Sequence, residues 1–428
     1  MADAKLVSAL TEAAEARRER LIEVVRQAVR IPSVTGAEGD AAAYFAEQCQ
    51  RLDVELDIWS PDIDELRAHR AFVPVEYDYA GRSNVVATRR GMGGGRDLVL
   101  YGHADTVPVD PNTAAAWTHA PTGGEVAEGR VYGRGAADMK GGCAVGLVAL
   151  EVLEELGVRL RGNVSAQFLL DEEAGGNGTL AAVLRGHYSA NAGCIMLEPT
   201  SPRLLVISGR GAQFYRIRVA GQEGGAEYHR DLVSAIDVAF TIYQAVKRFA
   251  QMREAELDAP LYAERWRTKV PTAICTLNAG NWPSTVPGEA VLEGTIECLP
   301  GEDIHAVVAR FERYLREVAA DDPWLREHPF SFERFGLWFD AAGIEPEHPF
   351  VTALRAASRD AIGVDPKVVG GGGSDLRLPV VYANCPTVLW GPGGGMIHSV
   401  DEYVEIDQLV AMLKAVLVAA VEWCGVAE

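Results

Sequence analysis

The feature that most constrains the fold is the alternation of short, mainly apolar segments with longer helical ones. Leu98–Tyr101, Val164–Leu170 and Cys194–Leu197 are too short for helices, and segments with helical character such as Gly141–Leu156 separate them. Strands of a parallel sheet have this pattern because helices cover both of its faces. The sequence therefore predicts an α/β fold whose first part, residues 1–208, forms a mostly parallel sheet.

The pattern changes near residue 208, where Phe214–Val219 alternates apolar residues with arginine, as expected of a strand exposed on one side. The order that follows is βαββαβ, which predicts a ferredoxin-like α+β domain over 209–338, inserted into the larger domain. The larger domain resumes over 339–428. The elements expected are helices at 5–30, 40–52, 232–252, 301–319, 350–362 and 406–422, and strands at 270–278, 288–297, 330–335 and 386–390.

Composition limits the partners and the location. The chain of 428 residues carries a formal net charge of −20, which argues against a nucleic-acid or anionic-membrane partner because both need a basic surface. Its seven cysteines form no CxxC pair, its N-terminus lacks a signal peptide, and no uncharged stretch is long enough to span a bilayer. We expect a cytoplasmic protein that acts on a small molecule.

Histidine and carboxylate residues follow the predicted strands directly, where ligands of open α/β sheets bind. These residues are His103 and Asp105, then Asp171, Glu172 and Glu173, and then Glu198. Three adjacent carboxylates at the end of a buried strand repel one another and need cations or protons. Each motif alone could be a solvated loop or a structural histidine, so the hypothesis of a site rests on their recurrence.

Two glycine-rich loops add one residue each. Asp138 lies in GRGAADMKGG (133–142), just before a predicted helix, where it could also serve as a helix N-cap. His398 follows GPGGGMI (391–397), after the last predicted strand. A mixture of imidazole and carboxylate ligands suits zinc, with cobalt or manganese as substitutes. No GxSxG, P-loop or GxGxxG motif competes for the role of active site.

These motifs resemble those of the zinc aminoacylase/carboxypeptidase superfamily, peptidase family M20. That family includes acetylornithine deacetylase, succinyl-diaminopimelate desuccinylase and glutamate carboxypeptidase. The resemblance covers nearly the whole chain. It is most specific in GHADTVP (102–108), WTHAP (117–121) followed by GRVYGRGAADMKGG (129–142), DEEAGGNGT (171–179), and GPG (391–393) followed by HSVDEYV (398–404).

The resemblance implies two divalent metals, with zinc as the expected ion. His103, Asp138 and Glu198 would hold one metal. Glu173, Asp138 and His398 would hold the other, with Asp138 bridging the pair. Asp105 would orient His103, and Glu172 would be the general base that takes a proton from water and passes it to the leaving amine. The expected reaction is hydrolysis of an N-acyl amino acid or a similar small amide.

The inserted domain departs from the family pattern at three positions. Gly225 stands where relatives have a histidine that helps to stabilise the oxyanion, although His229 could replace it if the loop shifts. Ser284 stands in place of an asparagine. Glu297 replaces an arginine that grips a substrate carboxylate, which suggests a cationic portion of the substrate near Glu297.

The glycine-rich substrate loop of the family is kept over 372–377, so Gly373, Ser374 and Arg377 are predicted to bind substrate.

Two alternatives to a deacylase stay open. The same metals could serve a dipeptidase or an amide-forming biosynthetic enzyme. The chain could also be a catalytically silent, metal-binding regulatory protein, although such a protein would not need Glu172. The resemblance further implies a homodimer that pairs through helix 232–252. Phe240, Ile242 and Tyr243 on that helix could equally pack against the sheet of their own domain.

Overall fold

The computed structural model describes residues 3–263 and 265–427, which divide into two compact units. The first unit runs to Ser208 and resumes over Gly343–Val369 and from Ser374 onward. The second unit comprises Gly209–Ala342 and Gly370–Gly373. The predicted insertion, 209–338, lies within the second unit.

The sheet of the first unit is parallel at its centre and antiparallel beside it. Its strands lie in the order β1 (Glu55–Trp59), β2 (Asn84–Arg89), β6 (Val164–Phe168), β3 (Asp97–Tyr101), β7 (Ala192–Met196), β17 (Thr387–Leu389), β8 (Leu204–Gly209) and β15 (Ala342–Gly343), and β16 (Lys367–Gly371) also pairs with β8. The parallel pairs join β6, β3, β7 and β17, whereas β1, β2 and β8 pair antiparallel with their neighbours. The predicted α/β class is confirmed. The parallel strands are those that the sequence predicted from their apolar residues. Strands β6 and β7 have such sequences because they are buried along their whole length.

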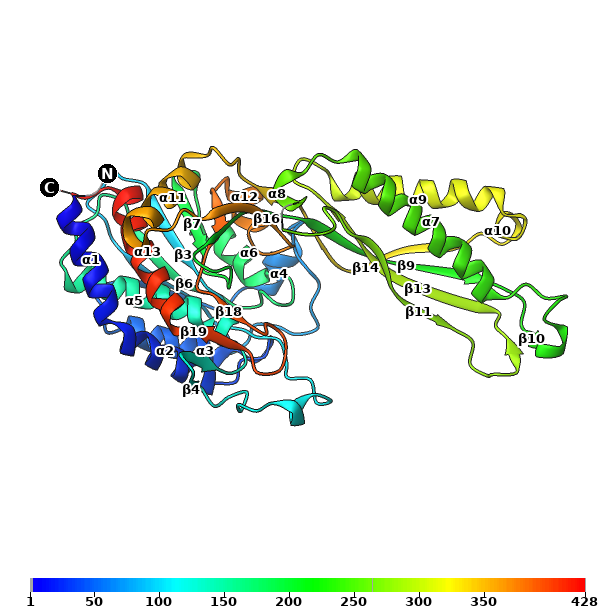
Figure 1. Ribbon diagram of the computed structural model, residues 1–428, viewed down its shortest axis with the longest axis horizontal. Coiled ribbons are helices and arrows are strands. Elements are labelled where there is room, and N and C mark those ends of the chain that lie inside the picture. The colour runs from blue at the N-terminus through cyan, green and yellow to red at the C-terminus, as the bar shows by residue number, and fades with distance from the viewer. Residues whose placement is uncertain (1–2, 264, 428) are drawn as a thin grey trace. The chain divides into compact units, whose positions relative to one another are not determined.

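Helix α5 (Gly141–Glu155) lies against this sheet and is almost entirely buried. It also contacts α2 (Arg18–Arg30) and α13 (Ile406–Cys424), which explains why so little of its surface is polar (Figure 1). The single helix predicted over 5–30 is wrong. Helix α1 (Ala4–Ala16) ends before Arg17, whose backbone (φ −91°, ψ 7°) is not helical, and α2 starts at the next residue. The two helices bury separate apolar faces, a division that the sequence marks with neither glycine nor proline.

The first unit also contains a small antiparallel sheet. Its order is β18 (Gly394–Gly395), β19 (Tyr403–Glu405), β5 (Arg130–Tyr132) and β4 (Glu125–Ala127). The other helices of the first unit are α3 (Gly39–Cys49), α4 (Ile63–Arg67), α6 (Asn177–Leu184), α11 (Pro349–Ile362) and α12 (Arg377–Ala383). Other short elements are β10 (Gly224–Gly225), α8 (Pro260–Ala263), β12 (Thr285–Val286) and α10 (Pro323–Glu327), with single turns at Ala114–Ala116 and Ala226–Tyr228.

The second unit has the predicted ferredoxin-like fold. Its antiparallel sheet has the order β11 (Thr272–Ala279), β13 (Glu289–Cys298), β9 (Gly211–Ala220) and β14 (Ser331–Phe339). Helices α7 (Ala235–Glu256) and α9 (Ile304–Asp321) lie side by side and contact this sheet (Figure 1). Ile242 is fully buried in the core beneath α7 and Tyr243 packs against that core, whereas Phe240 is 54% exposed.

Within the described residues, no helix combines the length and the apolar character needed to cross a bilayer.

Candidate metal centre

The four parallel strands of the first unit deliver most of the predicted ligands to one edge of the sheet. His103 forms a parallel bridge with Leu169, two residues before Asp171, so the end of β3 lies beside the loop that follows β6. On the other side of β3, the Leu197 amide donates to the Tyr101 carbonyl, which places Glu198 at the same edge. Parallel neighbours end at the same side of a sheet, and this is why residues so far apart in sequence meet.

The small sheet brings the remaining two ligands to the same place. Strand β5 leads into the loop that carries Asp138, and β19 pairs with both β5 and β18. His398 lies in the loop between β18 and β19. The two glycine-rich loops are therefore neighbours, and the peptide bond after Asp138 is cis.

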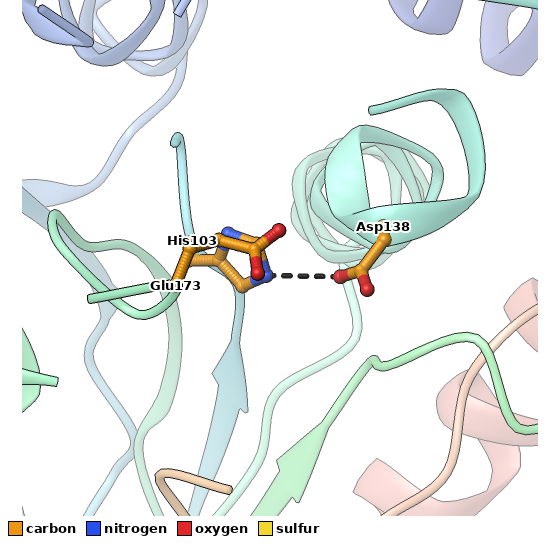
Figure 2. Close-up of side chains that lie close together, drawn as sticks. All are labelled: His103, Asp138 and Glu173. Carbon is orange, nitrogen blue, oxygen red and sulfur yellow. Dashed lines mark hydrogen bonds and ion pairs between the residues drawn. The ribbon is translucent and has the colours of Figure 1, made fainter. Parts of the chain in front are cut away.

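Asp138 lies between the two histidines. Its Oδ1 is 3.1 Å from His103 Nε2, and its Oδ2 is 3.4 Å from His398 Nε2. Glu173 Oε1 is 3.2 Å from His398 Nε2, and Glu198 Oε1 is 3.9 Å from His103 Nε2. Figure 2 shows the His103 imidazole facing the Asp138 carboxylate with Glu173 beside them. All five predicted ligands therefore meet in the first unit.

These separations fit a metal centre. Zinc bonds to histidine nitrogen and carboxylate oxygen are about 2.0–2.2 Å long, so tetrahedral ligand atoms lie about 3.3 Å apart. One ligand atom each from His103, Asp138 and Glu173 lie within 4.8 Å of one another. The two oxygens of Asp138 face different histidines, which is the arrangement that a carboxylate bridging two ions requires.

The electrostatics of the site call for positive charge. The Oε1 atom of Glu198 is buried and has no hydrogen-bond partner among residues 3–263 and 265–427. Burial, and then the charge of Asp138, raise the pKa of Glu198 well above its ordinary value. Hydrogen bonds with Asp138 and Glu173 raise the pKa of His398 to about 10, since carboxylates dominate its surroundings. A buried carboxylate with an unpartnered oxygen is costly unless a cation or a proton compensates it.

Glu172 lies beside this group without belonging to it. It is half-buried, and burial followed by the charges of Asp375 and Glu198 raises its pKa well above the ordinary value. A carboxyl group whose pKa is raised can hold and release a proton nearer to neutral pH, as general acid–base catalysis requires.

Asp105 contacts His103 and also fixes the loop of Glu172. The Nδ1 atom of His103 is 3.0 Å from the Asp105 carbonyl oxygen and 3.4 Å from its Oδ1. The carboxylate of Asp105 accepts the backbone N–H groups of Glu172 (3.2 Å) and Glu173 (3.1 Å). Burial alone would raise the pKa of Asp105, but the hydrogen bond with His103 lowers it below its usual range.

One buried group behind the site was missed in the sequence analysis. Glu402 accepts the backbone N–H groups of Ala137 and Asp138, each at 3.1 Å, and pairs with Arg134 at 2.5 Å. Glu402 is fully buried. Glu402 lies four residues after His398 within the HSVDEYV motif, so the motif pointed to this residue although no role was predicted for it.

Arg377, in the predicted substrate loop, is buried and forms hydrogen bonds within the protein. Arg377 is 4% exposed and donates to the Gly175 carbonyl at 2.8 Å and to Asp375 Oδ1 at 3.3 Å. The Ser374 hydroxyl accepts the Leu376 amide at 3.4 Å. In the second unit, a side chain at Gly373 would collide with the ring of Phe339. Arg377 thus ties the 374–377 segment to the loop that follows Glu172 and Glu173.

Glu297, which replaces the arginine expected at this position, has an ion-pair partner within the second unit. Glu297 pairs with Arg210 at 2.6 Å, and both side chains are largely buried. The charge of Glu297 is therefore compensated inside the second unit, contrary to the expectation of a free carboxylate that attracts a cationic substrate. Gly225 pairs with Thr285 between β10 and β12, and His229 is exposed, with its Nδ1 atom 3.1 Å from the Ala226 carbonyl oxygen.

Comparison with known proteins identifies the family. The model of peptidase family M20/M25/M40 matches residues 99–422, which include all five of the clustered histidine and carboxylate residues. The chain belongs to this family.

Two curated relatives cover almost the entire chain. The N-formyl-4-amino-5-aminomethyl-2-methylpyrimidine deformylase of Halalkalibacterium halodurans is 29% identical over 95% of this chain and 95% of its own length. The succinyl-diaminopimelate desuccinylase of Methylorubrum populi is 30% identical over 91% of this chain and 95% of its own. This member of the M20 family is thus a metal-dependent amidohydrolase.

A solved structure shares the fold. The YXEP protein of Bacillus subtilis, described as a dinuclear metal-binding peptidase from the M20 family, matches with a TM-score of 0.66. It is 17% identical and covers 95% of this chain and 98% of its own.

Proposed function

We propose that this M20 enzyme removes an acyl group from a small N-acylated amine or amino acid, with two divalent metals in its site. The observation that carries the proposal is the position of Asp138, whose two oxygens face His103 and His398 separately. Zinc is the favoured ion, with cobalt or manganese as substitutes, because the donors are imidazoles and carboxylates.

The ligands divide into two sets around Asp138. His103 and Glu198 lie on its Oδ1 side, and Glu173 and His398 lie on its Oδ2 side. When bound, two divalent ions supply a Lewis acid for the amide carbonyl and lower the pKa of water. The ligand carboxylates would then carry compensated charge, which suits their burial.

Glu172 is the proposed proton carrier. Its backbone is fixed by the bond to Asp105, and its carboxyl group has a raised pKa. The carboxylate accepts a proton from the attacking water and returns it to the leaving nitrogen, so that a carboxylic acid and an amine are released. Asp105 orients His103 and the loop of Glu172 together.

The relatives favour acyl removal over peptide cleavage, since both are named for releasing a small acyl group from an amine. The test is a panel of N-formyl, N-acetyl and N-succinyl derivatives of small amines and amino acids, with dipeptides in parallel. We expect metal-dependent release of the free acid and the free amine from at least one N-acyl compound. Cleavage of dipeptides alone would establish a dipeptidase instead, and formation of amide from acid and amine would establish a synthetic enzyme.

We further propose a homodimer that forms through the second unit. Strand β11 is at the edge of its sheet, with Cys275, Thr276, Leu277 and Asn278 exposed, and Phe240 projects from α7. An open strand edge beside an exposed aromatic side chain is suited to pairing with a second copy.

We expect wild-type protein to sediment as a dimer and Phe240→Asp to shift it to monomer. A control substitution of exposed Met92, in the first unit, should leave the dimer intact. A wild-type monomer at micromolar concentration would contradict this proposal.

The cysteines favour a reducing compartment such as the cytoplasm, because all seven are free thiols.

A further inference from the structure

We infer that Tyr77 and Tyr79 are positioning residues, which hold Asp171 and thereby aim the neighbouring Glu172 at its substrate. This inference rests on the proposed function in one respect, the role of Glu172 as the proton carrier. It adds two residues outside every motif discussed above.

The carboxylate of Asp171 is fully buried, although it lies next to Glu172 at the end of a buried strand. Both of its oxygens accept a phenol hydroxyl. Tyr77 donates to Oδ1, and Tyr79 donates to Oδ2 at 2.7 Å. Two hydroxyl groups, one on each oxygen, therefore fix the orientation of this buried side chain.

The two tyrosines are themselves supported by a buried ion pair. The guanidinium carbon of Arg82 lies 4.7 Å from the ring centroid of Tyr77 and 4.8 Å from that of Tyr79. Arg82 also pairs with buried Glu38 at 2.8 Å. Cation–π contacts are stronger when the arginine is desolvated, so buried Arg82 helps to hold the two rings in place.

The backbone of the loop needs such a support. Asp171 has a φ of 68°, in the left-handed region that non-glycine residues rarely adopt. Its carbonyl accepts the Gly176 amide at 2.7 Å, which closes the loop that carries Glu172 and Glu173. Aspartate tolerates this conformation better than most residues, and the two phenols on its side chain help to hold it there.

Glu172 is therefore fixed from both sides of its own backbone. Asp105 accepts the N–H groups of Glu172 and of Glu173, which follows it, and the clamped Asp171 sets the direction of the chain that enters Glu172. A misplacement of a reacting group by about 1 Å can reduce the rate roughly 100-fold, so loss of the clamp should reduce turnover more than substrate binding.

The test compares the double variant Tyr77→Phe/Tyr79→Phe with the control Tyr188→Phe. Tyr188 is also buried and also donates its hydroxyl to a side chain, Gln167 Oε1 at 2.6 Å, but this acceptor lies in strand β6 and not in the Glu172 loop. We expect the double variant to keep its metals and its KM, to lose about 10- to 100-fold in kcat, and to show the Glu172 carboxylate displaced by about 1 Å in a crystal structure. The control should match wild type in all four measurements.

Asp171→Asn is the second variant, in case the double variant does not fold. Asparagine tolerates the left-handed backbone but replaces one acceptor oxygen with a donor. A purely structural clamp would lower the melting temperature while kcat and the position of Glu172 stayed at wild-type values, and this result would overturn the inference. If wild-type enzyme hydrolyses no N-acyl compound, the proposed function fails. The crystal structures then decide alone, because an undisplaced Glu172 would refute the clamp.

Discussion

Removal of divalent ions with a strong chelator is expected to abolish amide hydrolysis, and readdition of zinc, cobalt or manganese is expected to restore it. The physical reason is the charge balance of the site. Asp138, Glu173 and Glu198 gather around two histidines, and the Oε1 atom of Glu198 has no hydrogen-bond partner in the described part of the chain. Without cations these carboxylates must repel one another or take up protons.

The same treatment should weaken the fold of the first unit. A ligand present at about 100 times its dissociation constant stabilises the native state by about 2.7 kcal/mol per site. We therefore expect a clear fall in melting temperature on chelation, measured by calorimetry, together with two ions per chain before treatment by elemental analysis.

Ligand variants serve as the controls for metal loss. His103→Ala and His398→Ala should each reduce the metal content, whereas His229→Ala should keep it, because His229 lies in the second unit, outside the ligand cluster. Full activity in protein shown to be free of divalent ions would refute the metal centre.

Glu172→Gln is expected to lower kcat by about 10²–10⁴-fold, the usual contribution of general acid–base catalysis. Glutamine keeps the size of the side chain but can neither accept nor return the proton. The KM and the metal content should change little, because the contacts that join Asp138, Glu173 and Glu198 to the two histidines do not involve Glu172.

Glu173→Gln provides the matched comparison one residue away. It should lose metal as well as activity, since Glu173 Oε1 faces His398 at 3.2 Å. If both variants lost metal equally, Glu172 would be a ligand and the assignment of the base would have to move to another group.

Local sequence signals were sufficient for the central strands and for the histidines and carboxylates that follow them, whereas the resemblance to the M20 family supplied the hypothesis that five of these residues bind metal. Strands β3, β6 and β7 are apolar because both of their faces are buried, so their ends, and the residues that follow them, could be located. Strands β1 and β2 were missed. The exposed positions of β1 give it no continuous apolar run, and its pairing with β2 depends on contacts with distant residues.

The departures from the family pattern could be found in the sequence but not interpreted from it. Glu297 stood out as an acidic residue in place of an arginine, yet its partner Arg210 lies 87 positions earlier and is reached only because β13 pairs with β9. Arg377 matched a substrate loop, and only its bonds to Gly175 and Asp375 reveal that it joins two loops.

The sequence by itself determined the α/β class, the ferredoxin-like insertion and the set of histidines and carboxylates at the strand ends, because periodicity and adjacency are local properties of a chain. Only the tertiary structure decided that the two oxygens of Asp138 face different histidines, that Glu402 holds the loop of Asp138 and that two tyrosines clamp Asp171. These contacts join residues separated by tens to hundreds of positions, and their geometry follows from which strands become neighbours, which no local pattern encodes.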